Sequence, residues 1–489
     1  MTPKIEIQPT TQLVFETGKR ENETMSGLLV PVIQKAREIE FFETLTKDLK
    51  VKMKVVVYTH QNKLETIVAG LAVGCEHIAQ MQTKLVPDTV AAGLFGMARF
   101  PDQAQINAFL RRFDDKAVAY LGEAHQALLL KYTQAGDRSK WLTLPNGQRV
   151  LPVDLDQTPL VTRSKLATGT AKGHFGRKRG NVGYKKSVAL LGGDVKEVLW
   201  LRLESGNTHG QDAVPEVLKQ IAALRKPLGL RADEILFRGD AQYGALNGVR
   251  AYQAAGYHYA VKGYTPLTAQ KLVAELPETA VWTSLGKDSN GSEVSVIDLG
   301  KVELRSDHDK ADVPSVRTRV VLLRRVGART RRKRGKGSPN VVTQEVVSYE
   351  HYLTDYDAEV LSAEGVIELY NGRETEESFF RGEQDGFGAQ YLRTNKGEGE
   401  AAFLWLLAST VNLLRWVQNT VFAGTELQQV GLSKLVHQAM RIPATIIRTA
   451  TTWIIILPEM ARLIRQLVNL WMERYLQLPL PLEPSTNST

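Results

Sequence analysis

The amino-acid sequence predicts an α/β protein: a mixed sheet interrupted by a β-rich insertion, with a helical region before it and helices after it. Three observations support this prediction. Apolar residues recur at helical spacing before residue 140, alternate as in strands from about residue 148, and then switch between the two periods. At 489 residues the chain is long enough for about two to four domains. Its 43% hydrophobic and 24% charged residues exclude collagen-like and disordered classes.

The first 140 residues combine a polar segment with a helical region. Residues 1–25 predict a flexible N-terminus, and residues 26–140 predict a helical domain. Within it, Leu64–Val73 has helical apolar spacing, Pro87-Asp88 begins a short helix and Pro101-Asp102 begins another. The last two helices resemble a helix-turn-helix, which binds DNA. Because any small helical bundle has this spacing, core packing is the simpler explanation for that pair.

The α/β core is expected in two segments, residues 148–264 and 351–400. Strands are predicted at Val150–Asp156, Ser187–Leu191, Glu197–Leu203, Glu234–Phe237 and Tyr257–Lys262, and helices at Asp212–Leu228 and Ala245–Ala255. In this order three antiparallel strands come first, and strands connected by helices then add in parallel.

The remaining segments surround this core. Residues 265–350 alternate as in strands and predict the β-rich insertion. Helix is predicted from Ala363 to about residue 475, with interruptions at Gly382–Gly388 and Pro443, so residues 401–475 form a C-terminal helical domain. The tail, residues 476–489, is rich in Pro, Ser and Thr and is expected to be disordered.

Positive charge is concentrated in two runs. Residues 159–193 contain eight Lys or Arg and no acid, and eight of the thirteen residues from Arg324 to Lys336 are basic. Such runs are typical of polyanion binding, although a single run is equally compatible with a solvated loop. Two runs that flank acidic motifs favour a nucleic acid as partner.

Several classes are excluded. One cysteine, Cys75, forms neither an internal disulfide nor a cysteine-rich metal site, and it fits a reducing compartment. No secretory signal is visible, and the longest uncharged apolar stretch, Ala401–Leu414, is shorter than the roughly 20 residues that span a bilayer. We therefore expect a cytoplasmic protein with no membrane partner. Walker, His-Glu-x-x-His and Gly-x-Ser-x-Gly motifs are absent from the sequence.

Three acids are candidates for a catalytic, metal-binding site. Asp156 lies at the end of one predicted strand, Asp240 follows another, and Glu377 lies on a predicted helix that places it on one face with Tyr370 and Arg373. Each acid alone is more simply a helix cap or a solvated side chain. Together they supply the oxygen ligands that Mg²⁺ prefers, while Arg373 and Tyr370 can contact a phosphate.

These residues resemble a known family. Asp156-x-Thr158, Arg238-Gly239-Asp240 followed by Tyr243-Gly244, and Tyr370-x2-Arg373-x3-Glu377 are similar to motifs of the DDE transposases of bacterial insertion sequences. The likeness covers residues 60–470 and is strongest to the cut-and-paste branch with a Tyr-Arg-Glu-Lys signature. It implies a ribonuclease H-like core, with Asp156, Asp240 and Glu377 holding two Mg²⁺ ions, for which Mn²⁺ substitutes.

The resemblance also implies a reaction and partners. The enzyme would cut double-stranded DNA at the terminal inverted repeats of its element and join the 3′-hydroxyls to target DNA, usually through a hairpin intermediate. It would act as a homodimer, near the bacterial nucleoid, and Met460–Trp471 is a candidate dimer contact. Expected DNA contacts are Tyr370, Arg373, Arg381, Lys172, Arg177, Lys178, Arg179, Lys185, Arg331, Arg332 and Lys333. Tyr243 and Trp282, which we expect to be exposed aromatic side chains, are candidates to receive an extruded base.

Two departures leave alternatives open. The signature lysine is expected seven residues after Glu377, where this chain has Gln384, and Arg381 could supply that charge instead. Asp154 shares a strand face with Asp156, and only the Asp-x-Thr pattern favours Asp156. A structure-specific nuclease on the same fold, or a DNA-binding derivative without catalysis, are therefore the alternative functions.

Overall fold

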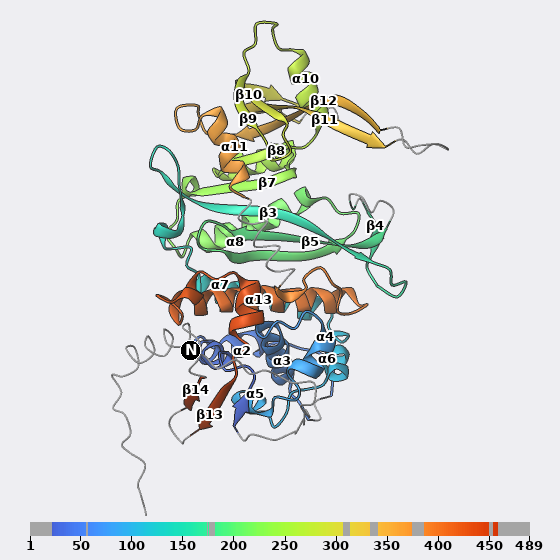
Figure 1. The fold of residues 1–489 in the computed structure, drawn as a ribbon, viewed down its shortest axis with the longest axis vertical. Coiled ribbons are helices and arrows are strands. Elements are labelled where there is room, and N and C mark those ends of the chain that lie inside the picture. Colours follow the sequence, from blue (N-terminus) through green and yellow to red (C-terminus); the bar gives the residue numbers. More distant parts are fainter. Residues whose placement is uncertain are drawn as a thin grey trace, which may run out of the picture.

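A computed structural model describes residues 22–54, 57–173, 175, 181–306, 313–332, 341–373, 386–448 and 453–457. The molecule is built in layers (Figure 1). Helices of the N-terminal region lie at one end, a large mixed sheet crosses the middle, and the β-rich insertion lies at the other end. The three parts follow the order that the sequence predicts.

The N-terminal region is helical, as predicted. Its helices are α1 (Leu29–Glu38), α2 (Phe41–Thr46), α3 (His60–Ala72), α4 (Ile78–Lys84), α5 (Thr89–Leu94), α6 (Gln103–Leu110) and α7 (Asp115–Tyr132). The Asp88 and Asp102 side chains cap α5 and α6 by accepting backbone N–H groups of Ala91 and Gln105. The apolar face of α6 is buried in the main core, which agrees with a packing role for this helix.

The central part of the sheet has the order β6-β5-β3-β7-β8. Its strands are β3 (Arg149–Thr162), β5 (Val182–Leu191), β6 (Glu197–Ser205), β7 (Ile235–Gly244) and β8 (His258–Gly263), with short strands β2 (Leu142–Thr143) and β4 (Ala171–Lys172) beside β3 and β5. β3, β5 and β6 are antiparallel, whereas β7 is parallel to β3 and β8 to β7. This mixed order agrees with the predicted ribonuclease H-like core.

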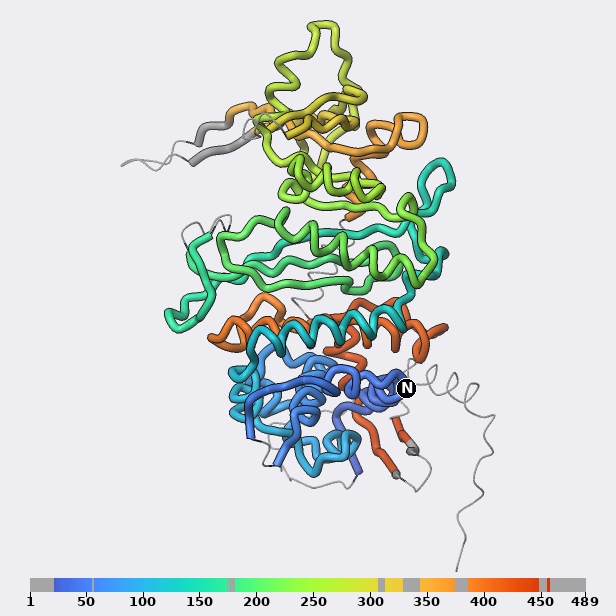
Figure 2. Tube along the Cα trace, turned by 180° about the vertical axis from the view of Figure 1, so that it is seen from behind, coloured from blue at the N-terminus to red at the C-terminus, as the bar shows by residue number. Residues whose placement is uncertain are grey.

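Helices cover both faces of this central sheet. Odd-numbered residues of β3 and β7, such as Val153 and Phe237, join residues of α8 (Val214–Arg225) and α9 (Leu246–Ala255) in the main core. These two helices are green in the view from behind (Figure 2). Even-numbered residues, such as Val150 and Leu236, join residues of α11 (Ala363–Asn371) in a second core. Alternation along the strands therefore separates an α8/α9 face from an α11 face.

The insertion continues the same sheet. It contains α10 (Pro266–Ala274), β9 (Thr283–Lys287), β10 (Glu293–Leu304), β11 (Val316–Arg332) and β12 (Val341–Thr354). Antiparallel pairing of Tyr352–Thr354 with Ala260–Lys262 joins β12 to β8, so eleven strands form one sheet. The second basic run begins within β11, whose last pair with β12 is Arg332↔Val341.

The C-terminal region differs from its prediction. Helix is present in α13 (Gly397–Thr420), α14 (Leu432–Lys434) and a π-helical turn that ends at Ala439, but β13 (Ala444–Arg448) and β14 (Trp453–Ile456) are strands. Pro443 ends the helical part, and the isoleucines that follow favour strands, so the prediction of helix across this segment was wrong.

The same small sheet corrects the N-terminal prediction. β1 (Glu23–Thr24) pairs with β13, and Thr24 is buried, so residues 22–25 are ordered against the C-terminal strands. Residues 1–21, the tail and Met460–Trp471 lie outside the described residues, and the predictions for them stay predictions.

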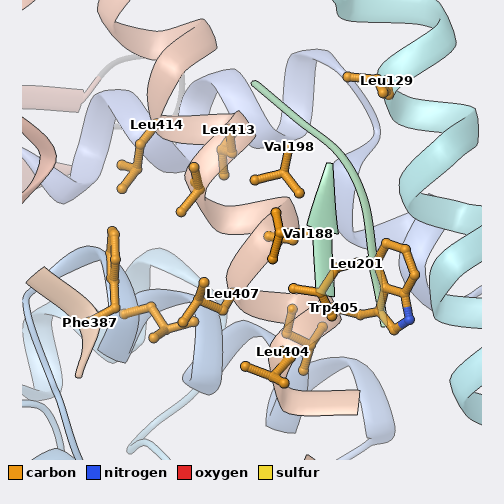
Figure 3. Close-up of a cluster of buried hydrophobic side chains, with 14 of the residues drawn as sticks. Leu129, Val188, Val198, Leu201, Phe387, Leu404, Trp405, Leu407, Leu413 and Leu414 are labelled. Atoms are coloured by element: carbon orange, nitrogen blue, oxygen red, sulfur yellow. The ribbon is translucent and has the colours of Figure 1, made fainter. Parts of the chain in front are cut away.

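α13 joins the N-terminal helices to the sheet. It runs beside α7 between the sheet and the other N-terminal helices (Figures 1 and 2). Its leucines lie in one buried cluster with Val188, Val198 and Leu201 of the sheet, and Leu129 of α7 belongs to the same cluster (Figure 3). A helix buried on nearly all sides is typical of the centre of a large protein. Neither α13 nor any other helix in the described ranges is long and apolar enough to cross a membrane.

Buried polar groups form directional hydrogen bonds where α7 and α13 meet β6. The ring of His125 bridges the Ser409 hydroxyl and the Val198 carbonyl, at 2.9 Å each, and Asn412 binds the Val198 backbone. Glu197, fully buried at the start of β6, accepts hydrogen bonds from the Gln134 backbone and the Trp416 indole at 3.1 and 3.0 Å. Burial raises the pKa of Glu197 to about 7.

We expect this carboxyl to make stability depend on pH. A folded-state pKa above the unfolded value stabilises the protein at low pH, and this contribution is lost as the pH rises through about 7. Glu197→Gln keeps hydrogen-bonding capacity without the charge. The unfolding free energy of the wild type, measured in urea, should therefore fall relative to that of Glu197→Gln by up to about 3 kcal/mol between about pH 5 and pH 8. The exposed Glu123→Gln is the control, and a difference that does not change with pH would contradict the assignment.

Candidate functional site

Two predicted acids meet where the parallel strands β3 and β7 separate. Pairing between these strands ends at Leu155↔Gly239, and Asp156 and Asp240 are the next residues on each strand. Thr158 Oγ1 donates to Asp156 at 3.1 Å, and the Gln242 backbone N–H donates to Asp240 at 2.9 Å. The sequence predicts Asp240 directly after a strand. In the structure β7 continues to Gly244, so Asp240 lies within the strand. The carboxyl ends of parallel strands are where α/β folds place their sites.

The electrostatics show that the two carboxylates are neighbours. Burial raises the pKa of Asp240, and the negative charge of Asp156 raises it further. The Gln242 N–H, Arg373 and Lys262 act in the opposite direction. Two partly buried carboxylates that repel each other supply the hard oxygen ligands that a divalent cation prefers.

The geometry separates Asp154 from Asp156. Asp154 is fully buried, and both of its oxygens accept hydrogen bonds from Arg238, from Nε at 2.6 Å and from Nη2 at 2.8 Å. Asp156 is only partly buried and lies beside Asp240. Of the two aspartates that the sequence leaves open, Asp156 is thus the one placed to bind a ligand.

Tyr370 and Arg373 lie at the same edge. Arg373 Nη1 donates to the Leu155 carbonyl at 3.4 Å, Nη2 donates to the Tyr370 hydroxyl at 3.3 Å, and the guanidinium lies 5.2 Å from the Tyr370 ring centroid. α11 ends at Asn371, and Gly372 and Arg373 form a turn, so Arg373 reaches the site from beyond the helix. The predicted continuous helical face through residue 373 was therefore wrong. Glu377, Arg381 and Gln384 lie outside the described residues.

The structure places some of the predicted DNA-contacting residues on the surface and others in the interior. Lys172 is exposed in β4. Lys185 is buried, and its ammonium donates to the Thr208 carbonyl at 2.6 Å, so it does not lie on the surface where the basic run predicted it. Burial lowers the pKa of Lys185, and Asp240 is among the acids that act against this. Arg331 and Arg332 belong to β11, while Arg177, Lys178, Arg179 and Lys333 lie outside the described residues.

The two aromatic candidates for base binding are covered. The Tyr243 side chain is only 1% exposed and lies in the core against Gly210. The prediction that it is exposed was therefore wrong. Trp282 is partly buried, and the Arg324 guanidinium lies 4.8 Å from its ring centroid. Neither ring is open to an extruded base in this structure.

Two residues near the acids escaped the sequence analysis. Lys262, at the end of β8, pairs with Glu350 at 2.6 Å and lowers the pKa of Asp240. Arg238 belongs to the Arg-Gly-Asp motif, but its buried pairing with Asp154 depends on strand register. The position of Lys262 at the end of a strand that neighbours Asp240 is the signal that would have identified it.

Among the residues whose positions are described, no cluster of three or more His, Cys, Asp or Glu side chains is arranged to hold a metal ion. The third predicted ligand, Glu377, is not among those residues. Of the three predicted ligands, Asp156 and Asp240 are thus described, and the ligand set as a whole stays a prediction.

Comparison with known proteins identifies the family. The family model described as "Transposase DDE domain group 1" matches residues 24–477, which is nearly the whole chain of 489 residues.

The chain belongs to the DDE transposase family.

A search of curated proteins gives no match to the chain. Membership in the family means that this transposase acts on DNA through its DDE domain, and the match spans the N-terminal helices, the sheet and the insertion. The predicted membership in the DDE transposases is confirmed, and the large mixed sheet is consistent with the predicted ribonuclease H-like fold class.

The pairing of the two acids yields a test that needs neither metal nor DNA. Since the charge of Asp156 raises the pKa of Asp240, Asp156→Asn should lower the pKa of Asp240. The measurement is a carbon-13 NMR titration of the aspartate carboxyls in the transposase. The exposed Asp194→Asn serves as the control and should leave the Asp240 resonance unchanged. An Asp240 titration that is the same in Asp156→Asn and the wild type would show that the two acids are not neighbours.

Proposed function

We propose that this transposase moves its element by cut and paste: it cleaves the element ends by phosphoryl transfer and joins the 3′-hydroxyls to target DNA, through a hairpin intermediate. The observation that carries this proposal is the convergence of Asp156 and Asp240 at one edge of the sheet, beside Arg373 and Tyr370. Acids for a cation and a guanidinium for a phosphate are the groups that this reaction needs.

Asp156, Asp240 and Glu377 would hold two Mg²⁺ ions, or Mn²⁺ in their place. The mutual repulsion of the two described carboxylates fits this role, because bound cations relieve it. When bound, such ions supply activation of a water or 3′-hydroxyl and stabilisation of the leaving oxygen. The raised pKa of Asp240 means that the site loads cations more completely as the pH rises and this carboxyl loses its proton.

Arg373 and Tyr370 would position the scissile phosphate. Arg373 is held by the carbonyl of Leu155, the residue directly before Asp156, and by the Tyr370 hydroxyl. Tyr370 is fixed in turn by edge-to-face packing on Tyr352, with ring centroids 4.9 Å apart. A guanidinium held in this way can meet two phosphate oxygens while the phosphorus lies next to the acids.

The basic segments would bind the duplex outside this site. In the strand order, β4 with Lys172 lies on one side of β3 and β7, and β11 with the two arginines at its end lies on the other side. This order fits a duplex that crosses the sheet at Asp156 and Asp240. Two protomers would pair the two element ends, each cutting in trans, as a homodimer. Arg324 and Arg325 would contribute less to DNA binding, because Arg324 stacks on Trp282 and Arg325 pairs with Glu350.

Cleavage of a plasmid that carries the DNA flanking the gene tests the proposal directly. Asp240→Ala should slow Mg²⁺-dependent cleavage at the element ends by at least about 100-fold, because a metal ligand is lost. DNA affinity should stay within about twofold of the wild type, since no phosphate contact is removed. Asp194→Ala, at an exposed acid, is the matched control and should cut normally.

The products separate the alternatives. Cuts together with joined products support transposition, whereas cuts alone indicate a structure-specific nuclease. Binding without cuts in Mg²⁺ or Mn²⁺ indicates a non-catalytic derivative, and Gln384→Lys would then be the variant to restore activity. Wild-type cleavage rates in both Asp240→Ala and Glu377→Ala would refute the catalytic assignment.

Salt dependence tests the basic arm formed by the end of β11. If Arg331 and Arg332 each neutralise one phosphate, the double variant Arg331→Ala/Arg332→Ala should reduce the slope of log affinity against log salt by about 2. Fluorescence anisotropy with element-end DNA between about 50 and 200 mM salt measures this slope. Lys219→Ala, at an exposed lysine of α8, is the control for a general loss of charge. An unchanged slope in the double variant would remove the arm from the DNA interface.

A further inference from the structure

A buried ion pair connects the two strands that carry the candidate acids. Asp154 and Arg238 are directly paired in the parallel register of β3 and β7, and their side chains are 0% and 2% exposed. Two parallel hydrogen bonds, of 2.6 and 2.8 Å, join the guanidinium to the carboxylate. Asp156 and Asp240 follow two residues later on the same faces of their strands, so this ion pair lies directly beside them.

Arg238 also holds the helix that leads to the rest of the site. Its third nitrogen, Nη1, donates to the Leu369 carbonyl of α11 at 3.1 Å. Leu369 precedes Tyr370, and a Cβ atom on Gly372 would lie only 3.3 Å from Arg238 Nη1. The turn that carries Arg373 therefore passes directly over this guanidinium.

We propose that Arg238 and Asp154 are positioning residues of the transposase, which hold Asp156, Asp240 and the Tyr370–Arg373 turn in the arrangement that binds cations and phosphate. The proposal rests on the proposed function. The Arg238 guanidinium, carried by β7, hydrogen-bonds to β3 and to the end of α11, so it links the three described segments that bear site residues.

Stability alone does not account for this pair. Burying two charges is costly, and well-packed apolar side chains of similar size often stabilise a protein as much or more. Asp154 is closely enclosed, because a Cβ on Gly192 would lie 2.2 Å from its Oδ2 atom. An ion pair gives directional bonds that an apolar contact lacks, and such groups around metal ligands tune both orientation and affinity.

The insertion supplies a matched control. Arg319 of β11 is 2% exposed, forms a forked pair with Asp298 of β10 and donates to the carbonyls of Tyr356 and Leu361. It shares three features with Arg238: a buried arginine, an aspartate on the neighbouring strand, and further carbonyl acceptors. The two pairs differ in the aspartate, since Asp298 is 30% exposed and Asp154 is fully buried. No site residue lies next to this pair on β10 or β11 in the proposed function.

The test compares two double variants of the full chain, Asp154→Leu/Arg238→Met and Asp298→Leu/Arg319→Met. Binding of Mn²⁺ to the protein without DNA is measured from the paramagnetic resonance of free Mn²⁺, and cleavage and DNA affinity are measured in parallel. We expect the first variant to bind Mn²⁺ about 10- to 100-fold more weakly and to cleave more slowly by a similar factor. Its DNA affinity, and all properties of the second variant, should stay within about twofold of the wild type.

Three outcomes decide the matter. Wild-type Mn²⁺ affinity and cleavage in the first variant overturn the positioning role. An equal loss in both variants also overturns it, because that loss would be a general effect of removing a buried arginine and its aspartate partner from the sheet. If Asp240→Asn, assayed alongside, cleaves at the wild-type rate, the proposed function itself fails.

A conservative variant covers the case in which Asp154→Leu/Arg238→Met does not fold. Arg238→Lys keeps the charge, but a single ammonium cannot donate to both oxygens of Asp154 and to Leu369 in the same planar geometry. It should weaken Mn²⁺ binding by an intermediate factor at unchanged DNA affinity. Wild-type Mn²⁺ affinity in Arg238→Lys would also overturn the proposal.

Discussion

The site of this transposase depends on a short parallel pairing between β3 and β7. Only five residue pairs, from Leu151↔Ile235 to Leu155↔Gly239, set the register of the two strands. A slip by one residue would turn every side chain of one strand to the opposite face. Asp156 would then point towards the α8/α9 face while Asp240 stayed on the α11 face. The buried pair of Asp154 and Arg238 forms only in the observed register, because its hydrogen bonds join directly paired residues. The register of β3 and β7 therefore fixes the positions of both acids and of α11 together.

Elements on both sides of β3 and β7 stabilise the pairing of these two strands. α13 packs on β6 and α7, and its buried polar side chains bind the backbone of β6 at Val198. Because β6 pairs with β5, and β5 with β3, the helical region is fixed to the strand that carries Asp156 through an unbroken series of hydrogen bonds. On the other side, β12 pairs with β8, and β8 with β7. The helical region and the insertion are therefore both fixed to the strands that carry the two acids.

Local patterns predicted much of this fold, and non-local pairing accounts for what they missed. Alternation located β3, β5, β6, β7 and β8, and helical spacing located α3, α8 and α9, because these signals depend on neighbouring residues alone. Sequence did not distinguish Asp154 from Asp156, since both share a strand face and only the partner strand shows which one meets Arg238. The same holds for Tyr243, whose burial depends on the Gly210 segment, and for β13, which pairs with β1 more than 400 residues earlier. The role of Glu377 remains a prediction from its motif.

The charges around Asp240 fit the proposed function, in which one site binds both a cation and a phosphate. Lys262 and Lys185 lie close enough to affect or be affected by Asp240, yet Lys262 pairs with Glu350 and Lys185 donates to the Thr208 carbonyl. Arg373 is likewise engaged by the Leu155 carbonyl and the Tyr370 hydroxyl. These cations moderate the repulsion between the two carboxylates through space while their hydrogen bonds go to other groups. In the proposed function the two carboxylates would bind metal ions, and the positive charges of Arg373, Lys262 and Lys185 would attract the DNA backbone to the same place.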